Sequence, residues 1–145
     1  MKSSNLLEIL IIIIVISILS WITFNQFNLA KAKSRDVDRR ANLNEVAKAI
    51  RLYYADYGEL PSDEIINSLW GKPWIDNGYT YMAKVPKENF LNKEFCYQAS
   101  ADGKTFTFFA ELENKSDVDC KKIEQICNNQ SYCFINKLES VVIKI

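Results

Sequence analysis

The feature that most constrains this chain is its N-terminal run, because no side chain between Ile9 and Ala30 is ionisable. At about 1.5 Å of rise per residue, a helix over this run is roughly 33 Å long, which matches the hydrocarbon core of a bilayer. The run is longer than the apolar core of a secretory signal peptide, which has about 7–15 residues. Its first part is apolar on every side, which disfavours a half-buried helix of a soluble core. The sequence therefore predicts a membrane-spanning helix.

The same helix is expected to continue well beyond the membrane. No Gly or Pro occurs before Gly58 and Pro61, and these residue types most often end helices. We predict one helix in two parts, a transmembrane part over 4–30 and an amphipathic continuation over 31–57 that covers a soluble core. The apolar residues of the second part recur at the three-and-four spacing of one helical face, namely Leu43, Val46, Ala47, Ile50, Tyr53, Tyr54 and Tyr57.

One acidic residue, Glu8, stands at the start of the apolar run. A charged side chain costs about 2.5–3.5 kcal/mol at the centre of a membrane helix and less near its end. An incidental carboxylate at the membrane interface is therefore one interpretation of Glu8. A specific role in assembly is the other.

The residues that follow the apolar run are strongly basic, and this bears on membrane orientation. By the positive-inside rule alone, the C-terminal part would lie in the cytoplasm. The cysteines favour the opposite side, since an even number clustered in a small domain is typical of disulfides formed in an oxidising compartment. We interpret the basic residues as the solvated face of the helix, with contact to anionic lipid or DNA as the alternative. They are Lys31, Lys33, Arg35, Arg39 and Arg40, and the cysteines are Cys96, Cys120, Cys127 and Cys133.

Composition argues against catalysis and against binding through bulk charge. Eighteen basic and eighteen acidic residues give a formal net charge of zero, so the chain as a whole does not attract nucleic acid. Histidine, the commonest general base and metal ligand, is absent from the sequence. No nucleophile elbow or glycine-rich phosphate loop occurs either. We expect that the protein is not an enzyme.

Residues 58–145 are predicted to form an α+β head. A short helix is expected over 62–69 with Ser62 or Asp63 as its cap, followed by a long connection over 70–90. Strands over 94–100 and 104–112 flank the turn Ala101-Asp102-Gly103, because Asp-Gly supplies the positive φ of a tight hairpin. The aromatic residues of the connection are expected to pack it onto the head, with a ligand groove as the alternative. They are Trp70, Trp74, Tyr79 and Tyr81.

The second of these strands has a distinctly apolar face. Phe106, Phe108, Ala110 and Leu112 alternate with polar residues such as Thr105, which is the period-two pattern of a half-buried strand. We predict that this face packs on the apolar stripe of the long helix.

A short amphipathic helix is expected over 116–129, and one or two final strands after it. On such a helix Cys120 and Cys127 lie roughly 10.5 Å apart along the axis, beyond the Cα separation of about 7 Å that a disulfide tolerates. Two connectivities remain. The preferred one joins Cys96 to Cys120 and Cys127 to Cys133, and the other joins Cys96 to Cys127 and Cys120 to Cys133. A four-thiolate zinc site is a weaker alternative, because no Cys-x-x-Cys pair is present.

Three stretches together resemble the type IV pilin-like proteins, and are most similar to the major pseudopilins of type II secretion systems. The first, "SSNLLEILIIIIVISIL", is similar to the prepilin N-terminus. The second, "NLNEVAKAIRLYYADYGELP", resembles the end of the long pseudopilin helix. The third, "FCYQASADGKTFTFFAELEN", resembles the family's hairpin. The resemblance implies a pilin-like fold and a structural subunit that polymerises through its N-terminal helix into a type II secretion or type IV pilus-like filament.

The resemblance also implies roles for residues near the N-terminus. Residues 1–3 correspond to a prepilin leader, and cleavage would fall between Ser3 and Ser4, where the family has Gly and Phe. Glu8 would then pair with the new amine on Ser4 of an adjacent subunit and set the register of assembly. The implied partners are other copies and other pilin-like subunits, the lipid bilayer, a prepilin peptidase, an inner-membrane platform protein and an assembly ATPase.

The implied location is the inner membrane, spanned once, with the head outside the cytoplasm. Major pseudopilins also carry calcium in a C-terminal loop, and Asp117 and Asp119 offer oxygen ligands there. Helix capping by Ser116 and Asp119 explains the same residues without a metal. The alternative to a filament subunit is a single-pass, membrane-anchored binding domain that does not polymerise.

Overall fold

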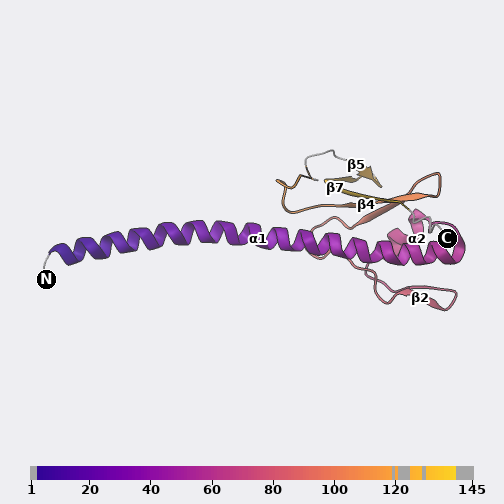
Figure 1. The fold of residues 1–145 in the computed structure, drawn as a ribbon, viewed down its shortest axis with the longest axis horizontal. Coiled ribbons are helices and arrows are strands. Elements are labelled where there is room, and N and C mark those ends of the chain that lie inside the picture. The colour runs from indigo at the N-terminus through magenta and orange to yellow at the C-terminus, as the bar shows by residue number, and fades with distance from the viewer. Residues whose placement is uncertain (1–2, 119, 121–124, 129, 140–145) are drawn as a thin grey trace.

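The computed structural model describes residues 3–118, 120, 125–128 and 130–139. Its dominant element is α1 (Ser3–Tyr57), one uninterrupted helix of 55 residues that runs along the whole molecule (Figure 1). This confirms the predicted continuous helix, about 80 Å long. The helix ends at Gly58, whose φ of +72° suits glycine and whose N–H donates to the carbonyl of Tyr54 at 2.8 Å.

The head is built around the second half of α1 and has the expected α+β composition. An antiparallel sheet of order β3-β4-β7 lies on one side of α1, and the β1–β2 hairpin lies on the opposite side (Figure 1). A further hairpin pairs β5 with β6. The elements after α1 are α2 (Asp63–Ser68), β1 (Trp74–Asp76), β2 (Tyr79–Met82), β3 (Cys96–Ala99), β4 (Thr105–Ala110), β5 (Gln125–Cys127), β6 (Gln130–Tyr132) and β7 (Phe134–Glu139).

The predicted short helix and hairpin are both confirmed. Ser62 caps α2, its hydroxyl accepting the N–H of Ile65 at 3.4 Å. Strands β3 and β4 pair antiparallel around the Asp-Gly turn, where Gly103 has a φ of +64°. At the base of this turn the Ser100 hydroxyl accepts the N–H of Thr105 at 3.0 Å. The turn sequence therefore sets the register that brings the apolar face of β4 onto the helix.

The core lies between α1 and β4, as the apolar patterns of both segments predict. Leu43, Val46 and Ile50 of α1 are fully buried together with Phe106 and Phe108 of β4. Burying a side chain of this size contributes roughly 1.5–3 kcal/mol relative to leaving it exposed. The second half of α1 is thus part of the head's core.

The connection over 70–90 contains a hairpin that the sequence analysis missed. Strands β1 and β2 pair through Asn77 and Gly78, whose φ values of +46° and +79° fit a type I′ turn. The dipeptide Asn-Gly is a sequence signal for such a turn, so this hairpin is predictable from the sequence. Trp74 and Tyr81 are buried as expected, whereas Tyr79 is half exposed, contrary to the packing predicted for it.

The α-helix predicted over 116–129 is wrong for most of the described residues, although Cys120 is in 3₁₀-helical conformation. Residues 125–127 form strand β5, and the chain around 115–118 forms turns. Asp119 and residues 121–124 and 129 lie outside the described residues. Strands β6 and β7 confirm the final strand expected over 131–137. A second one, expected over 139–145, lies outside the described residues beyond Glu139.

Candidate assembly site

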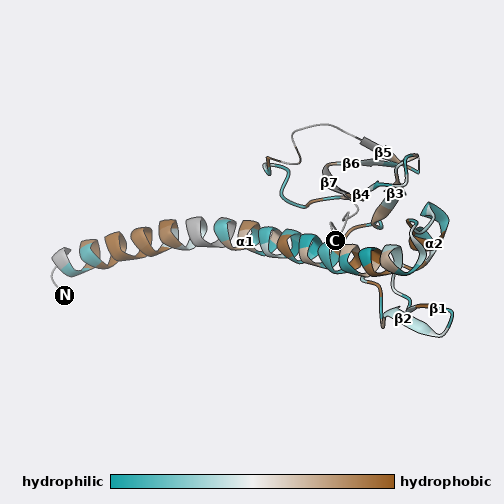
Figure 2. Cartoon of the chain, turned by 45° about the vertical axis from the view of Figure 1, so that its right-hand side comes forward, coloured by the Kyte–Doolittle hydropathy of each residue, from teal (hydrophilic) through white to brown (hydrophobic). Residues whose placement is uncertain are grey.

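The first half of α1 projects away from the head, and apolar residues predominate along its described part (Figure 2). We refer to residues 5–30 as the stem. From Leu6 to Leu19 the large apolar side chains are each 49–61 % exposed. By length and composition, the stretch from Asn5 contains a helix apolar enough to cross a membrane. The stem therefore needs lipid or other apolar surfaces around it.

Glu8 lies in the stem near the end of α1 that is farthest from the head (Figure 1). Its side chain is exposed. Ser4 precedes it by four residues in the same helix, so the two positions share one helical face. Cleavage between Ser3 and Ser4 and the pairing of Glu8 with a new amine both stay predictions.

At the other end of the stem, a buried ion cluster joins α1 to two loops of the head. We call it the polar junction: Arg35, Asp36, Arg39, Glu88 and Glu113. The guanidinium of Arg39 is its centre, and Arg39 as a whole is 3 % exposed. Its Nη1 lies 2.7 Å from Asp36 Oδ1, its Nε 2.6 Å from Glu88 Oε2 and its Nη2 2.7 Å from Glu113 Oε1. A buried guanidinium is tolerated because each of its three nitrogens is paired with a carboxylate.

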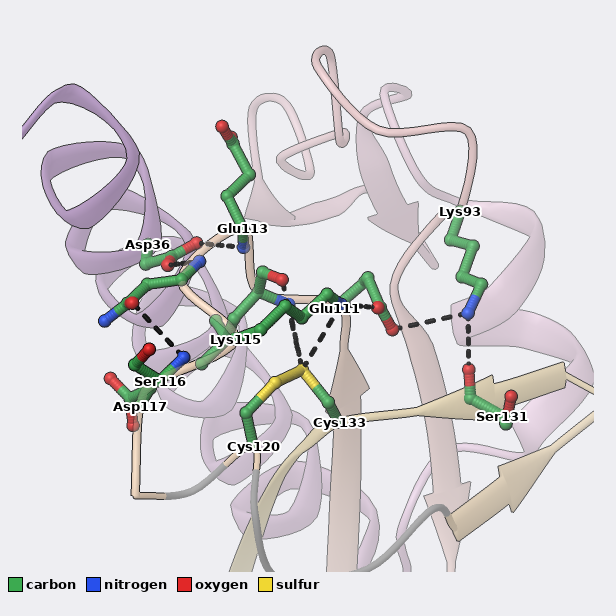
Figure 3. The surroundings of a disulfide bond; sticks show 12 residues. Asp36, Lys93, Glu111, Glu113, Lys115, Ser116, Asp117, Cys120, Ser131 and Cys133 are labelled. Carbon is green, nitrogen blue, oxygen red and sulfur yellow. Dashed lines mark hydrogen bonds and ion pairs between the residues drawn. A yellow bond between two sulfur atoms is a disulfide. The ribbon is translucent and has the colours of Figure 1, made fainter. Parts of the chain in front are cut away.

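The carboxylates of the polar junction also hold backbone groups of the head loops. Asp36 accepts the N–H of Glu113 and the N–H of Asn114, both at 2.9 Å (Figure 3). Glu88 accepts the N–H of Phe90 at 2.8 Å. The polar junction therefore fixes where the chain leaves β4 and how the loop after residue 88 turns, both relative to α1.

Further arginine contacts surround the polar junction. Arg35 Nε donates to Glu113 Oε1 at 2.8 Å, and its guanidinium stands 5.3 Å from the ring centre of Phe90. Arg40 pairs with Asp117 at 3.0 Å. Three successive arginines of α1 therefore reach head residues on one side of the helix.

These contacts shift the pKa values of the charged groups. Hydrogen bonds from Arg35, together with those from Arg39, lower the pKa of Glu113 from its ordinary 4.5 to about 2. Burial by itself would raise the pKa of Glu88, but the ion pair with Arg39 and the N–H of Phe90 outweigh it and lower that pKa. The same carboxylates raise the pKa of Arg39 despite its burial. All these groups are charged at neutral pH.

The interpretation of Arg39 as part of a solvated basic face is therefore wrong. Asp36 stands three residues before Arg39, a spacing that a sequence shows. The other two carboxylates lie 49 and 74 residues further along the chain. Only the folding of the head brings Glu88 and Glu113 to the helix.

Of the two predicted disulfide connectivities, the structure contains the one that was not preferred. Cys96 bonds to Cys127 and Cys120 bonds to Cys133, so the preferred pairing of Cys96 with Cys120 is wrong. That preference assumed a helix carrying Cys120 and Cys127. Strand β5 instead brings Cys127 beside β3, where Cys96 lies. All four cysteines are bonded, which leaves no thiolate for the zinc alternative.

The two residues expected to bind calcium, Asp117 and Asp119, do not form a metal site in the described part of the chain. Asp117 faces Arg40, and Asp119 lies outside the described residues. Within the described part of the chain, no group of three or more acidic or cysteine side chains is placed to hold a metal ion. The described carboxylates of this loop, Glu113 and Asp117, are neutralised by arginines. Calcium binding by the loop stays a prediction.

A long helix, exposed and apolar in its first half and packed on a small antiparallel sheet in its second, is the architecture of the pilin-like proteins. The chain belongs to the family described as type II secretion system (T2SS), protein G, whose model matches residues 26–128. This is the family of the major pseudopilin, a structural component of type II secretion. The comparison with curated proteins found no match, and neither did the comparison with solved structures.

Replacing Arg39 tests the polar junction. We expect Arg39→Met to lower the free energy of unfolding by about 3–5 kcal/mol, because it leaves buried carboxylates without a counter-ion. Lys48→Met is the matched control, since Lys48 forms an exposed pair with Glu45 on the same helix, and should change stability by about 0.5 kcal/mol or less. Urea unfolding of the full chain in detergent measures both. Equal effects would show that the polar junction adds no special stability.

Acid should weaken the same contact. The folded pKa of Glu113, about 2, lies below its ordinary value of 4.5, so its stabilising contribution is complete above pH 4.5 and is lost as the pH falls toward 2. We expect the free energy of unfolding to decrease over this range and Glu113→Gln to flatten the decrease. Glu45→Gln, at an exposed helix position, is the control and should leave the profile unchanged. A Glu113→Gln profile as steep as that of the parent would contradict the assignment.

Proposed function

We propose that this chain is a pseudopilin that polymerises through its stem into the filament of a type II secretion or type IV pilus-like machine. The observation that carries this proposal is the exposure of the stem's described apolar side chains, which surround the helix from Leu6 to Leu19 and lie outside the head's core. In the membrane, lipid covers them. A subunit drawn out of the membrane keeps them from water only by packing them against other stems.

Glu8 gives this packing a register. Cleavage after Ser3 leaves an ammonium group on Ser4, and the carboxylate of Glu8 in an adjacent subunit then neutralises it inside the apolar bundle. An unpaired charge there costs several kcal/mol, so axial positions that pair the two groups are favoured over slipped ones. The exposure of Glu8 on the stem leaves it free to meet a neighbouring subunit.

The proposed setting follows from the same features. The two disulfides favour a head outside the cytoplasm, and the stem anchors the subunit in the inner membrane until assembly. The family supports association with other pilin-like subunits. A prepilin peptidase, a platform protein and a cytoplasmic ATPase complete the proposed machine.

A second function is compatible with the stem and the disulfides. In it, the chain is a single-pass membrane-anchored binding domain that stays monomeric. This alternative leaves the rigid continuation of the stem into the head without a purpose, since a flexible linker would anchor a domain equally well. The two functions differ in whether stems contact one another.

Cross-linking along the stem distinguishes them. With cysteines introduced at Ile12 and Ile16, we expect ladders of oligomers in cells that contain the assembly machinery, and only monomers if the chain is a simple anchor. Glu8→Val should insert normally yet reduce the ladder by about tenfold or more, because loss of one charge pair worth over 1.4 kcal/mol shifts an equilibrium by that factor.

The control for Glu8→Val is the double variant Leu7→Glu with Glu8→Leu. It keeps composition and hydropathy but moves the carboxylate around the helix, so it should also assemble poorly. Normal ladders from Glu8→Val would refute the role of Glu8 in setting the register but would not contradict polymerisation through the stem. Normal ladders from the double variant would show that any nearby carboxylate suffices.

The N-terminus gives an independent test. Intact-mass measurement of the chain purified from cells with an active prepilin peptidase should show loss of residues 1–3, with or without one added methyl group on Ser4. Ser4→Phe, which restores the residue type of the family, is the positive control for processing. An intact Met1 in such cells would count against the leader and against the Ser4 amine as the partner of Glu8.

A further inference from the structure

The two disulfides have contrasting surroundings. Cys96 and Cys127 are 2 % and 4 % exposed and are buried beside Phe109 and Tyr132. The cysteines of the second disulfide are partly exposed and line an open cavity of about 280 Å³. As far as the described residues are concerned, an external molecule can therefore reach the second disulfide in the folded head, whereas the first is enclosed.

Polar groups lie against one sulfur of this accessible disulfide. The N–H of Leu112 points at Cys133 Sγ from 3.3 Å, and the ammonium of Lys115 stands 4.0 Å from the same sulfur (Figure 3). Both groups stabilise negative charge. They make Cys133 the more stable thiolate, and therefore the better leaving group when the S–S bond is attacked.

Among the described residues that line it, the cavity next to the disulfide has a positive charge balance. Glu111 lies between Lys93 and Lys115 and forms ion pairs with both (Figure 3). Lys93 also donates to the carbonyl of Ser131 at 2.8 Å, which holds its ammonium at the cavity wall. Two ammonium groups facing one carboxylate favour the approach of an anion such as a thiolate.

We propose that Cys120–Cys133 is a thiol–disulfide exchange site, at which an external low-molecular-weight thiolate adds to Cys120. The incoming sulfur bonds to Cys120 Sγ as the S–S bond breaks. The electron pair of the broken S–S bond stays on Cys133 Sγ, which leaves as a thiolate. One disulfide is lost and one is formed, so the step consumes only the thiolate. Attack of the Cys133 thiolate on the mixed disulfide reverses it and expels the external thiol.

The disulfide lies next to a turn that contacts α1. The disulfide closes the segment between Cys120 and Cys133 and lies next to the end of β4 through Leu112. The preceding turn carries Asp117, which pairs with Arg40 of α1. Addition of a thiol at Cys120 therefore modifies the head close to its contact with the helix. The inference does not depend on polymerisation.

Reduced glutathione is the probe that tests the proposal. The full chain in detergent micelles is incubated with it at neutral pH, quenched with N-ethylmaleimide and mapped by peptide mass spectrometry. We expect glutathione on Cys120 with maleimide on Cys133, formed at least about tenfold faster than any opening of Cys96–Cys127. Equal rates at the two disulfides, or glutathione on Cys133, would overturn the proposal.

Charge variants separate the effect of Lys115 from that of exposure alone. Lys115→Gln should slow adduct formation at Cys120 about fivefold, and Lys115→Arg should restore most of the rate, because the thiolate loses and regains a cationic neighbour. Lys48→Gln, far along α1, should leave the rate unchanged. An unchanged rate in Lys115→Gln would show that Lys115 does not stabilise the Cys133 thiolate.

Single-cysteine variants give a measurement that does not need the disulfide. In Cys120→Ser the remaining Cys133 thiol should react with N-ethylmaleimide at lower pH than the Cys120 thiol does in Cys133→Ser. The pH dependence of the two rates measures this order. A more acidic thiol at Cys120 would reverse the predicted direction of attack and overturn the proposal.

Discussion

Packing of the apolar stripe of α1 against strand β4 is the contact on which the fold of the head depends. Leu43, Val46 and Ile50 belong with Phe106 and Phe108 to one hydrophobic cluster, and all of these side chains are fully buried. A three-stranded sheet needs such a covered face for stability. The helix is therefore both the wall of the head's core and, in its first half, an apolar rod that leaves the head. One element links a soluble environment to an apolar one without a break.

The polar junction lies where these two environments meet. Burying the guanidinium of Arg39 is acceptable only because three carboxylates surround it, and two of these carboxylates also accept backbone N–H groups of the head loops. The requirement to satisfy every buried charge leaves few alternative arrangements. The polar junction thus sets the position of the head along the helix, while the apolar core supplies most of the stabilisation.

Much of the fold was predictable because its signals are local. The absence of Gly and Pro before Gly58 predicts the length of α1, and the Asp-Gly turn predicts the β3–β4 hairpin. The Asn-Gly turn at residue 77 is an equally local signal, and it indicates the β1–β2 hairpin. The disulfide pairing differs from the preferred prediction because the amphipathic pattern around Cys120 and Cys127 indicates a helix. Strand pairing overrode that pattern and carried Cys127 to Cys96.

By itself, the sequence determined that one helix has an apolar first half long enough to cross a membrane and an amphipathic second half suited to cover a head, because helical periodicity and the lack of helix breakers are properties of consecutive residues. It also determined the apolar character of the stem and the position of Glu8 on it. Tertiary structure alone decided the partners of Arg39 and the surroundings of the Cys120–Cys133 disulfide. These contacts join residues far apart in the chain, and their energies depend on burial and on distances that exist only after the head has folded.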